Sequence, residues 1–297
     1  MEIAIQAKRR SLGGFEVGRV LPFAARRMVG PFVFFDHMGP AEFEPNIPRD
    51  ADVRPHPHIG LSTITYLFDG EITHRDSLGV EQPIRPGEVN WMTAGRGITH
   101  SERFDGMRAH GGAMDGIQTW VALPTGEEET DPGFDHYGAE ALPLLEEGGM
   151  SARLIAGSAF GVAGRVKTFS PMFYLHARLE PGAAVPLPSG HEERALYVAR
   201  GTVEAEGREY GHGWMLVFGK DEAPRIRASE RSEVMLLGGA PLGERHIWWN
   251  FVSSSKERID QAKADWKAGR FVLPLHDHDE FIPLPEDPPP PQPEPMS

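Results

Sequence analysis

Two pairs of polar residues, each with a single residue between its members, are the part of this sequence best suited to chemistry. His56 and His58 stand in the segment RPHPHIG, and His100 and Glu102 stand in GRGITHSERF. Side chains at positions i and i+2 of a β-strand point to the same face, so each pair would present its two side chains together. Three imidazoles and one carboxylate, without sulfur, suit iron, manganese, nickel, copper or zinc. The spacing predicts a metal site whose four protein ligands leave two positions open on an octahedral ion, which favours Fe(II).

The residues between the two pairs supply the turns that would bring them together. Gly70, Gly79 and Gly87 separate short apolar runs, as expected of strands joined by tight turns. Ile64 and Tyr66 follow the first pair and make that strand apolar, so the imidazoles are predicted to be buried. A buried ring nitrogen without a partner is costly, and a bound metal removes that cost.

A second histidine pair, His276 and His278, competes with the first; it lies in the segment LPLHDHDEFIPLPEDPP. No long strand-turn-strand stretch follows it to return further ligands, and the sequence beyond is rich in proline. We therefore predict an exposed or docking segment there rather than a metal site.

Two other polar pairs have two interpretations each. His74 and Asp76, in THRDSLG, are predicted either to hydrogen-bond near the metal or to form a turn. Asp36 and His37 follow a strongly apolar strand in FVFFDHMGP. They are predicted either to lie at the barrel mouth as partners of the metal ligands, or to belong to a strand-ending turn closed by Gly39-Pro40.

Short apolar runs rich in β-branched and aromatic residues place the chain in the all-β class. The runs include STITYLF, VNWMTA, IQTWVALP, MFYLHARL, ALYVARG and WMLVFG, and the chain has 34 glycines and 27 prolines to punctuate them. This pattern favours a β-sandwich or barrel.

One short C-terminal helix is predicted near residues 255–268. Ser254 to Glu257 have the form of a capping box, in which serine and glutamate satisfy each other's free amides. Three apolar residues follow at helical spacing: Ile259, Ala262 and Trp266. Gly269 is placed to end the helix, which is predicted to pack against one barrel.

The sequence also contains a weak internal repeat. Tyr66 to Gly70 resembles Tyr197 to Gly201, at an offset of 131 residues. Trp91-Met92 resembles Trp214-Met215, at an offset of 123 residues. Each copy reads strand, glycine turn, strand, longer loop, strand, so the repeat predicts two β-barrels in tandem.

The repeat also indicates which barrel would hold a metal. At the first offset, the first histidine pair falls on Leu187 and Ser189, so the second copy lacks these ligands. We predict a metal-binding N-terminal barrel over residues 1–130 and a C-terminal barrel without metal over residues 131–285. Residues 286–297 are acidic and proline-rich, and we predict a disordered tail.

Charge and cysteine content exclude several classes of function. The chain has 297 residues, 30 basic and 43 acidic, and a net charge of −13, which argues against direct nucleic-acid binding. It has no cysteine, so it has no disulfide, no thiolate ligand and no cysteine nucleophile. The first residues, MEIAIQAKRR, lack the apolar stretch of a signal peptide, and no run is long enough to span a membrane. We expect a soluble, cytoplasmic protein.

At this point the motifs resemble those of the pirin family, a branch of the cupin superfamily. The resemblance rests on FFDHMGP, HPHIGLSTITYLFDGEITHRDSLG, PGEVNWMTAGRGITHSE and LYVARGTV, and covers roughly residues 15 to 285. It implies a bicupin of two facing jelly-roll β-barrels with a C-terminal helix. It also implies iron in the N-terminal barrel, bound by His56, His58, His100 and Glu102. It implies a C-terminal barrel without metal. Many cupins carry a glutamate where this chain has Thr63, but pirin-like chains take their carboxylate after the late histidine.

The resemblance implies two alternative functions. Pirin-like proteins are associated with quercetin 2,3-dioxygenase activity. On this hypothesis a flavonol or related enol or phenolic substrate binds as its anion, Glu102 serves as ligand and proton acceptor, and O2 opens the ring with release of carbon monoxide. The alternative is an iron-dependent redox-sensing co-regulator that acts through a protein partner. An open, apolar pocket at the first barrel would favour the enzyme, and a sealed one would favour the regulator.

Overall fold

The computed structural model describes residues 1–11 and 16–286, and its regular structure is mostly antiparallel β-sheet. The strands of the first half are β1 (Ile3–Gln6), β2 (Lys8–Ser11), β3 (Glu16–Leu21), β4 (Phe32–Phe43), β5 (Val53–His58), β6 (Leu61–Asp69), β7 (Ile72–Asp76), β8 (Glu81–Ile84), β9 (Val89–Thr93), β10 (Ile98–Arg103), β11 (Gly112–Ala122) and β12 (Gly133–Tyr137). The strands of the second half are β13 (Leu144–Glu147), β14 (Met150–Ala159), β15 (Val162–Ala163), β16 (Met172–Leu179), β17 (Glu193–Arg200), β18 (Val203–Ala205), β19 (Arg208–Tyr210), β20 (Trp214–Gly219), β21 (Ile226–Ala228), β22 (Ser232–Gly239), β23 (His246–Trp248) and β24 (Phe251–Ser253). The helices are α1 (Asp105–His110) and α2 (Lys256–Lys267), with short 3-10 turns at Arg49–Ala51, Thr125–Glu127 and Ala139–Ala141.

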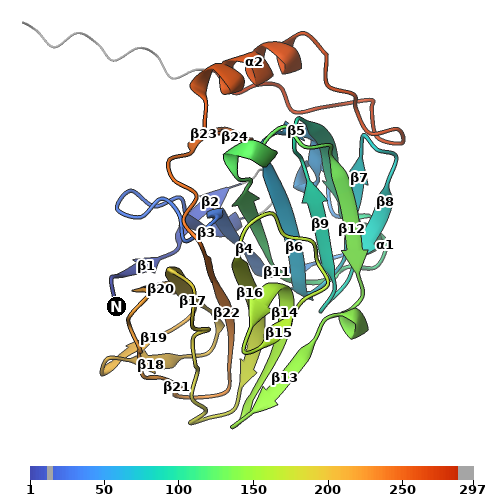
Figure 1. Cartoon of the computed structure of the whole chain (residues 1–297). Coiled ribbons are helices and arrows are strands. Elements are labelled where there is room, and N and C mark those ends of the chain that lie inside the picture. The colour runs from blue at the N-terminus through green and yellow to red at the C-terminus, as the bar shows by residue number, and fades with distance from the viewer. Residues whose placement is uncertain (12–15, 287–297) are drawn as a thin grey trace, which may run out of the picture.

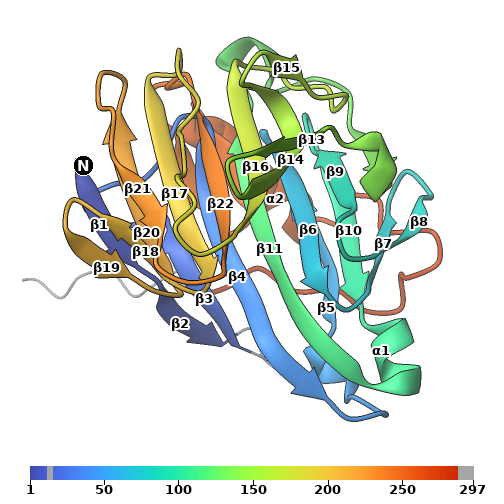
Figure 2. The same cartoon turned by 90° about the horizontal axis from the view of Figure 1, so that it is seen from below.

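Two large sheets form the centre of the molecule (Figures 1 and 2). One has the order β12-β9-β6-β11-β4-β3-β2, and the other has the order β1-β20-β17-β22-β16-β14-β13 with β15 paired to β14. Successive strand residues point to opposite faces, and in β6 both faces are apolar. Ile64 and Tyr66 contribute to the core cluster that also contains Tyr197 of β17, whereas Leu67 contributes to a separate cluster on the other face. β6 is therefore a continuous apolar run because one of its faces packs against the other large sheet and its other face is covered as well.

A smaller sheet covers the outer face of each large sheet. The sheet β5-β10-β7-β8 lies over the N-terminal large sheet, and Ile72 of β7 and Leu67 of β6 belong to one core cluster. The sheet β19-β18-β21 lies over the C-terminal large sheet, and Val203 of β18 and Leu196 of β17 belong to one core cluster. Each half is thus a two-sheet jelly roll whose sheets are not closed by hydrogen bonds into one barrel, and the all-β bicupin prediction is confirmed.

The strands that carry the sequence repeat occupy equivalent places in the two large sheets. β6 lies between β9 and β11, and β17 lies between β20 and β22. Tyr66 pairs with Val89 of β9, and Tyr197 pairs with Met215 of β20. The predicted internal repeat is therefore confirmed for strand order. The match of Trp91-Met92 with Trp214-Met215 is wrong, because Trp91 pairs with Ile64 of β6 whereas Met215 pairs with Tyr197 itself.

Two segments cross between the halves. β1 pairs with β20, so that Ile3 lies opposite Val217 in the C-terminal sheet. In the opposite sense, β24 and α2 pack on the N-terminal half, where Phe251 forms a bridge with Ile59 (Figure 1). The predicted division at residue 130 stays a prediction, and β12, which follows it, pairs with β9.

Helix α2 forms as predicted but with a different cap. Ser255, not Ser254, is the N-cap, and its hydroxyl oxygen accepts from the amide of Arg258 at 3.3 Å. Ser254, the predicted cap, does not cap the helix. Its amide and its hydroxyl donate instead to the buried carboxylate of Glu128, at 2.9 and 3.1 Å. Gly269, at φ +66°, ends the helix as expected.

Only Glu286 of the predicted proline-rich tail belongs to the described part of the chain, so the prediction of a disordered tail lies outside the described residues. Within residues 1–11 and 16–286, neither helix has the length and apolar character needed to cross a membrane.

Candidate metal centre

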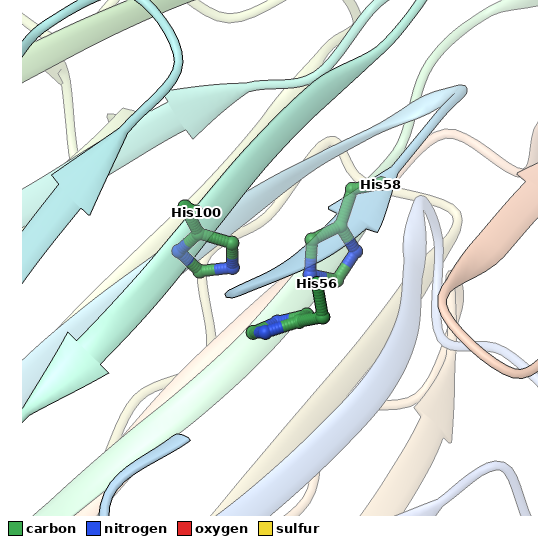
Figure 3. Close-up of side chains that lie close together, drawn as sticks. All are labelled: His56, His58 and His100. Carbon is green, nitrogen blue, oxygen red and sulfur yellow. The ribbon is translucent and has the colours of Figure 1, made fainter. Parts of the chain in front are cut away.

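Three imidazoles converge on one point of the N-terminal half (Figure 3). β5 and β10 are antiparallel neighbours, with His100 directly opposite His56 and Ile98 opposite His58. One ring nitrogen of each histidine lies within 4.8 Å of those of the other two. All three side chains are buried. The predicted convergence of the three histidines is therefore confirmed.

Backbone carbonyls orient two of the imidazoles. His56 Nδ1 lies 2.8 Å from the carbonyl oxygen of Arg54, and His58 Nδ1 lies 3.1 Å from that of Asn250. A carbonyl oxygen can only accept, so each Nδ1 carries the hydrogen and each Nε2 keeps a free lone pair. Burial lowers the pKa of His56 to about 4 and the pKa of His58 well below its usual value. Both rings are therefore neutral near pH 7, the form that binds metals.

The third imidazole shows that the site fits a metal. His100 Nε2 is buried without a hydrogen-bond partner in the described part of the chain, and burial lowers the pKa of this ring well below its usual value. Leaving a buried ring nitrogen unpaired is costly, and a cation bound by the three rings would remove that cost. The donor set of neutral imidazoles, in a chain without cysteine, suits Fe, Mn, Ni, Cu or Zn.

Glu102 lies beside the three imidazoles but outside their close group. A β-bulge between His100 and Glu102 changes the pairing of β10 with β5. Gln118 Nε2 donates to Glu102 Oε1 at 3.2 Å, and Gln118 Oε1 accepts from Thr65 Oγ1 at 2.7 Å. Burial raises the pKa of Glu102 to about 7. The carboxyl group is thus held in place and balanced between its protonated and ionised forms, in the absence of a cation.

The burial of the histidines was predicted for the wrong reason. Ile64 and Tyr66 do not continue β5, because the chain turns at Gly60 and they lie on β6, facing the other large sheet. Trp120 of β11 instead packs edge-on against His58, with 5.1 Å between ring centroids. Gly60 is required in this turn: its φ is +67°, and a Cβ would lie 2.0 Å from the carbonyl oxygen of Val252.

A cavity of about 740 Å³ opens onto His56, His58 and Glu102. Its apolar wall includes Trp249 and the pair Phe34 and Trp120, whose rings stack at 4.0 Å with an interplanar angle of 13°. Ligand pockets usually measure about 300–1,000 Å³ and combine apolar walls with a few polar groups. The first half therefore has an open cavity, lined by two of the three imidazoles, rather than a sealed one.

The other polar pairs are divided between different sites. Asp36 lines the cavity and forms two hydrogen bonds of 2.8 Å with Arg19. His37 points to the opposite face of β4 and lies 2.8 Å from the hydroxyl of Tyr197. The predicted turn at Gly39-Pro40 is wrong, because β4 continues through these residues and pairs with β11 as far as its end.

The segment around the second histidine pair docks on the outside of the small sheet. Asp277 accepts from Arg103 Nε and Nη2, both at 2.7 Å, and from Ser101 Oγ at 2.5 Å. Ser101 and Arg103 alternate along β10 with the two predicted ligands of that strand. The side chain of His278 is exposed and contacts the carbonyl of Leu275. The docking alternative is therefore the one observed.

Several residues of the site had no signal in the sequence. Gln118 and Trp120 stand two residues apart on β11, inside an apolar run that resembles any buried strand. The carbonyl of Asn250 is 192 positions from His58 and has no side-chain signature at all. At the positions that the repeat aligns with the first histidine pair, Leu187 packs against the C-terminal core and Ser189 is exposed.

Comparison with known proteins assigns the chain to a family. The family model described as Pirin matches residues 14–121, and the one described as Pirin C-terminal cupin domain matches residues 174–272. A pirin-like protein of Caulobacter vibrioides is 63% identical over 287 residues, which is 96% of this chain and 100% of that protein. A crystal structure of quercetin 2,3-dioxygenase from Acinetobacter baumannii has a TM-score of 0.88 at 30% identity, and covers 96% of this chain and 95% of that one. A second structure with this name from the same organism has a TM-score of 0.83 at 29% identity, with coverage of 91% and 97%. With two facing jelly rolls, three converging imidazoles and these relatives, the chain belongs to the pirin family.

Proposed function

We propose that this protein is a metal-dependent dioxygenase of the quercetin 2,3-dioxygenase type. Its substrate would be a flavonol or a related enol or phenolic compound, and its second substrate would be O2. The observation that carries the proposal is the convergence of three neutral imidazoles, two of which line a cavity large enough for such a substrate. The name of the similar Acinetobacter baumannii structures supports the same reaction class.

We propose His56, His58, His100 and Glu102 as the metal ligands. Fe(II) is the metal that we propose, with Mn, Ni, Cu or Zn as the alternatives, since the donor set contains nitrogen and oxygen without sulfur. Such an ion, with open coordination positions, supplies Lewis acidity and a place for the substrate anion and O2. In the structure the Glu102 carboxylate accepts a hydrogen bond from Gln118, with the Thr65 hydroxyl beside it.

Glu102 Oε would take the hydroxyl proton when the substrate binds as its anion. In the metal-free protein, burial raises the pKa of this carboxyl group to about 7, and a bound cation would lower it, so that the carboxylate is ionised and able to accept a proton. Thr65 donates to Gln118, and Gln118 donates to the Glu102 carboxylate, so this chain of hydrogen bonds holds the carboxylate in place. These contacts support a role for Glu102 in proton transfer in addition to metal binding.

The cavity wall would hold a flat aromatic ring system. Phe34 and Trp120 stack on each other, and the Arg19 guanidinium lies 4.5 Å from the centre of the Phe34 ring. Asp36 holds Arg19 in this position through two hydrogen bonds. Aromatic walls with a few fixed polar groups suit a phenolic substrate. The open cavity also favours an enzyme over a redox-sensing regulator, for which a sealed site was expected.

The test is metal analysis of the purified protein, followed by anaerobic loading with Fe(II) and measurement of quercetin decay under O2. We expect one metal ion per chain and turnover in the wild type, and loss of both in His58→Ala. His278→Ala is the matched control, because it removes an exposed histidine from the other histidine pair. Absence of metal from the wild type would contradict the proposal. Iron without turnover would favour the regulator and its protein partner.

A further inference from the structure

Three neighbouring strands of the small sheet each carry a polar pair at positions i and i+2. β10 lies in the middle, with β5 on one side and β7 on the other. β7 carries His74 and Asp76, and both side chains are buried. His74 Nδ1 lies 3.3 Å from His100 Nδ1, and His74 Nε2 lies 3.0 Å from Asp76 Oδ2. A chain of carboxylate, imidazole and imidazole therefore leads to one of the three converging rings.

The hydrogens in this chain have one consistent arrangement when His74 is neutral. Asp76 Oδ1 accepts from the amides of Leu78 and Val80, at 2.8 and 3.1 Å, so the turn fixes the carboxylate. Asp76 Oδ2 can then only accept, and His74 Nε2 donates to it. His74 Nδ1 is left as an acceptor, so His100 Nδ1 must be the donor. His100 Nε2 then has a free lone pair, in agreement with its lack of a partner in the described chain.

This arrangement differs from that of the other two rings. His56 and His58 donate to backbone carbonyls, which no substitution of a side chain removes. His100 instead faces a histidine, whose acceptor nitrogen depends on the hydrogen bond at its other end. The ring of Phe134 stacks on His74 at 4.4 Å and 22°, which holds the plane of His74. His100 is thus the one member of the group whose tautomer is set by side chains.

We infer that Asp76 and His74 are positioning residues that fix the tautomer of His100, so that its Nε2 is available to a metal. This inference rests on the proposed metal site, but its central claim concerns the metal-free protein. Hydrogen bonds to metal-binding histidines commonly set the ring tautomer and orientation, and their loss lowers metal affinity by about 10–100-fold. Here the effect passes through two rings, and the carboxylate is anchored by a turn.

The decisive variant is Asp76→Asn. The amides of Leu78 and Val80 still need an acceptor, so the side-chain oxygen stays there and the NH2 group faces His74 Nε2. His74 Nε2 must then accept, His74 Nδ1 must donate, and His100 Nδ1 must accept. The hydrogen of His100 moves to Nε2. We expect nitrogen NMR of the metal-free protein, at a pH above the imidazole pKa values, to show this inversion at His100, and Fe(II) affinity to fall about 10–100-fold.

Two variants at His74 separate the relay from a general loss of packing. His74→Asn places a side-chain oxygen where Nδ1 stood, so it retains an acceptor for His100 and should keep the wild-type tautomer. His74→Leu removes that acceptor, so His100 should populate both tautomers and bind Fe(II) more weakly. Circular dichroism and thermal unfolding establish that each variant is folded before its spectrum is compared.

Two results would overturn the inference: a wild-type His100 with its hydrogen on Nε2, or an unchanged His100 tautomer in folded Asp76→Asn. Failure of the proposed function has a different signature. In that case the wild type binds no Fe(II), or binds it without turnover, while the tautomer of His100 still inverts in the Asp76→Asn variant. The NMR measurement therefore judges the relay independently of catalysis.

Discussion

Tyr66 and Tyr197 occupy equivalent positions in the two large sheets, and each hydroxyl hydrogen-bonds a histidine of the opposite sheet. The Tyr66 hydroxyl lies 3.0 Å from His176 Nδ1, and the Tyr197 hydroxyl lies 2.8 Å from His37 Nδ1. The two contacts have the same form, so the interface repeats the internal symmetry of the chain in its polar groups. Both are buried, where a hydrogen bond is costly to lose.

An arginine joins the two contacts. His37 Nε2 lies 2.6 Å from Asp115 Oδ1, and His176 Nε2 lies 2.9 Å from Glu233 Oε2. Arg200 donates from Nε to Asp115 at 2.8 Å and from Nη1 to Glu233 at 3.4 Å. A continuous polar network therefore runs between the two large sheets inside an otherwise apolar interface.

Removing either interface hydroxyl should destabilise the protein. Tyr66→Phe and Tyr197→Phe each leave a buried histidine nitrogen without its donor, so we expect the free energy of unfolding to fall by about 1–3 kcal/mol in each. Tyr174→Phe is the matched control, because the Tyr174 hydroxyl is buried without a partner in the described chain. Urea denaturation measures all three. Equal destabilisation by the three variants would contradict a specific role for the two hydrogen bonds.

Acid should weaken the same interface. Burial lowers the pKa of His176 below its usual 6.5, and the hydrogen bond from His176 lowers the pKa of Glu233 below its usual 4.5. Below pH 6.5 the unfolded chain therefore binds more protons than the folded one, so stability falls as the pH falls through the pKa of unfolded histidine. Below pH 4.5 the free energy of unfolding falls further, because Glu233 then binds a proton more readily in the unfolded chain than in the folded one. One proton contributes a slope of at most about 1.4 kcal/mol per pH unit.

His176→Gln isolates this contribution, since it removes the titrating ring while the other buried histidines remain. We expect the free energy of unfolding of this variant to depend less on pH than that of the wild type between pH 6.5 and the lower pKa of folded His176. Denaturant titrations at a series of pH values measure the difference. If the free energies of unfolding of the two proteins differ by the same amount at every pH, the pKa of His176 does not change on folding.

Replacing Glu102 with glutamine separates its two proposed roles. Gln retains an oxygen that can contact a metal, but its amide cannot act as a base near pH 7. Turnover of quercetin should therefore fall far more than metal content. We expect at least about a 100-fold loss of turnover from the missing base. Metal analysis and initial rates on the same samples give the comparison. Equal losses of metal and turnover would leave Glu102 as a ligand without a role in proton transfer.

The docked segment around Asp277 should loosen when its charge is removed. Asp277→Asn weakens the hydrogen bonds from Arg103, which contribute about 1.5–3 kcal/mol each when charged. The amide of Ile282, which donates to the carbonyl of Pro55 at 2.8 Å, should then exchange its hydrogen faster. Asp279→Asn is the control, because Asp279 is exposed and has no hydrogen bond within the described residues. Unchanged exchange at Ile282 in the Asp277 variant would show that the segment is held by other contacts.

The parts of the structure that depend on local spacing could be predicted from the sequence. The parts that depend on contacts between distant segments could not. The histidines of β5 and β10 could be placed because alternate residues of a strand share a face. The N-cap of α2 could not be chosen between Ser254 and Ser255, because Glu128, more than 100 positions earlier, decides which serine is free to cap. The Asn250 carbonyl that orients His58 was equally out of reach. A backbone oxygen leaves no mark on residue type.

The exchange of segments between the two halves has a consequence for biosynthesis. β1 is translated well before its partner strand β20, in which Val217 lies opposite Ile3. The carbonyl of Asn250 arrives later still, so His58 lacks its orienting contact until the turn between β23 and β24 has been made. Contacts between residues so far apart in the chain form slowly and expose unpaired strands in the meantime. The first half therefore completes the contact that orients His58 only after most of the second half has been synthesised.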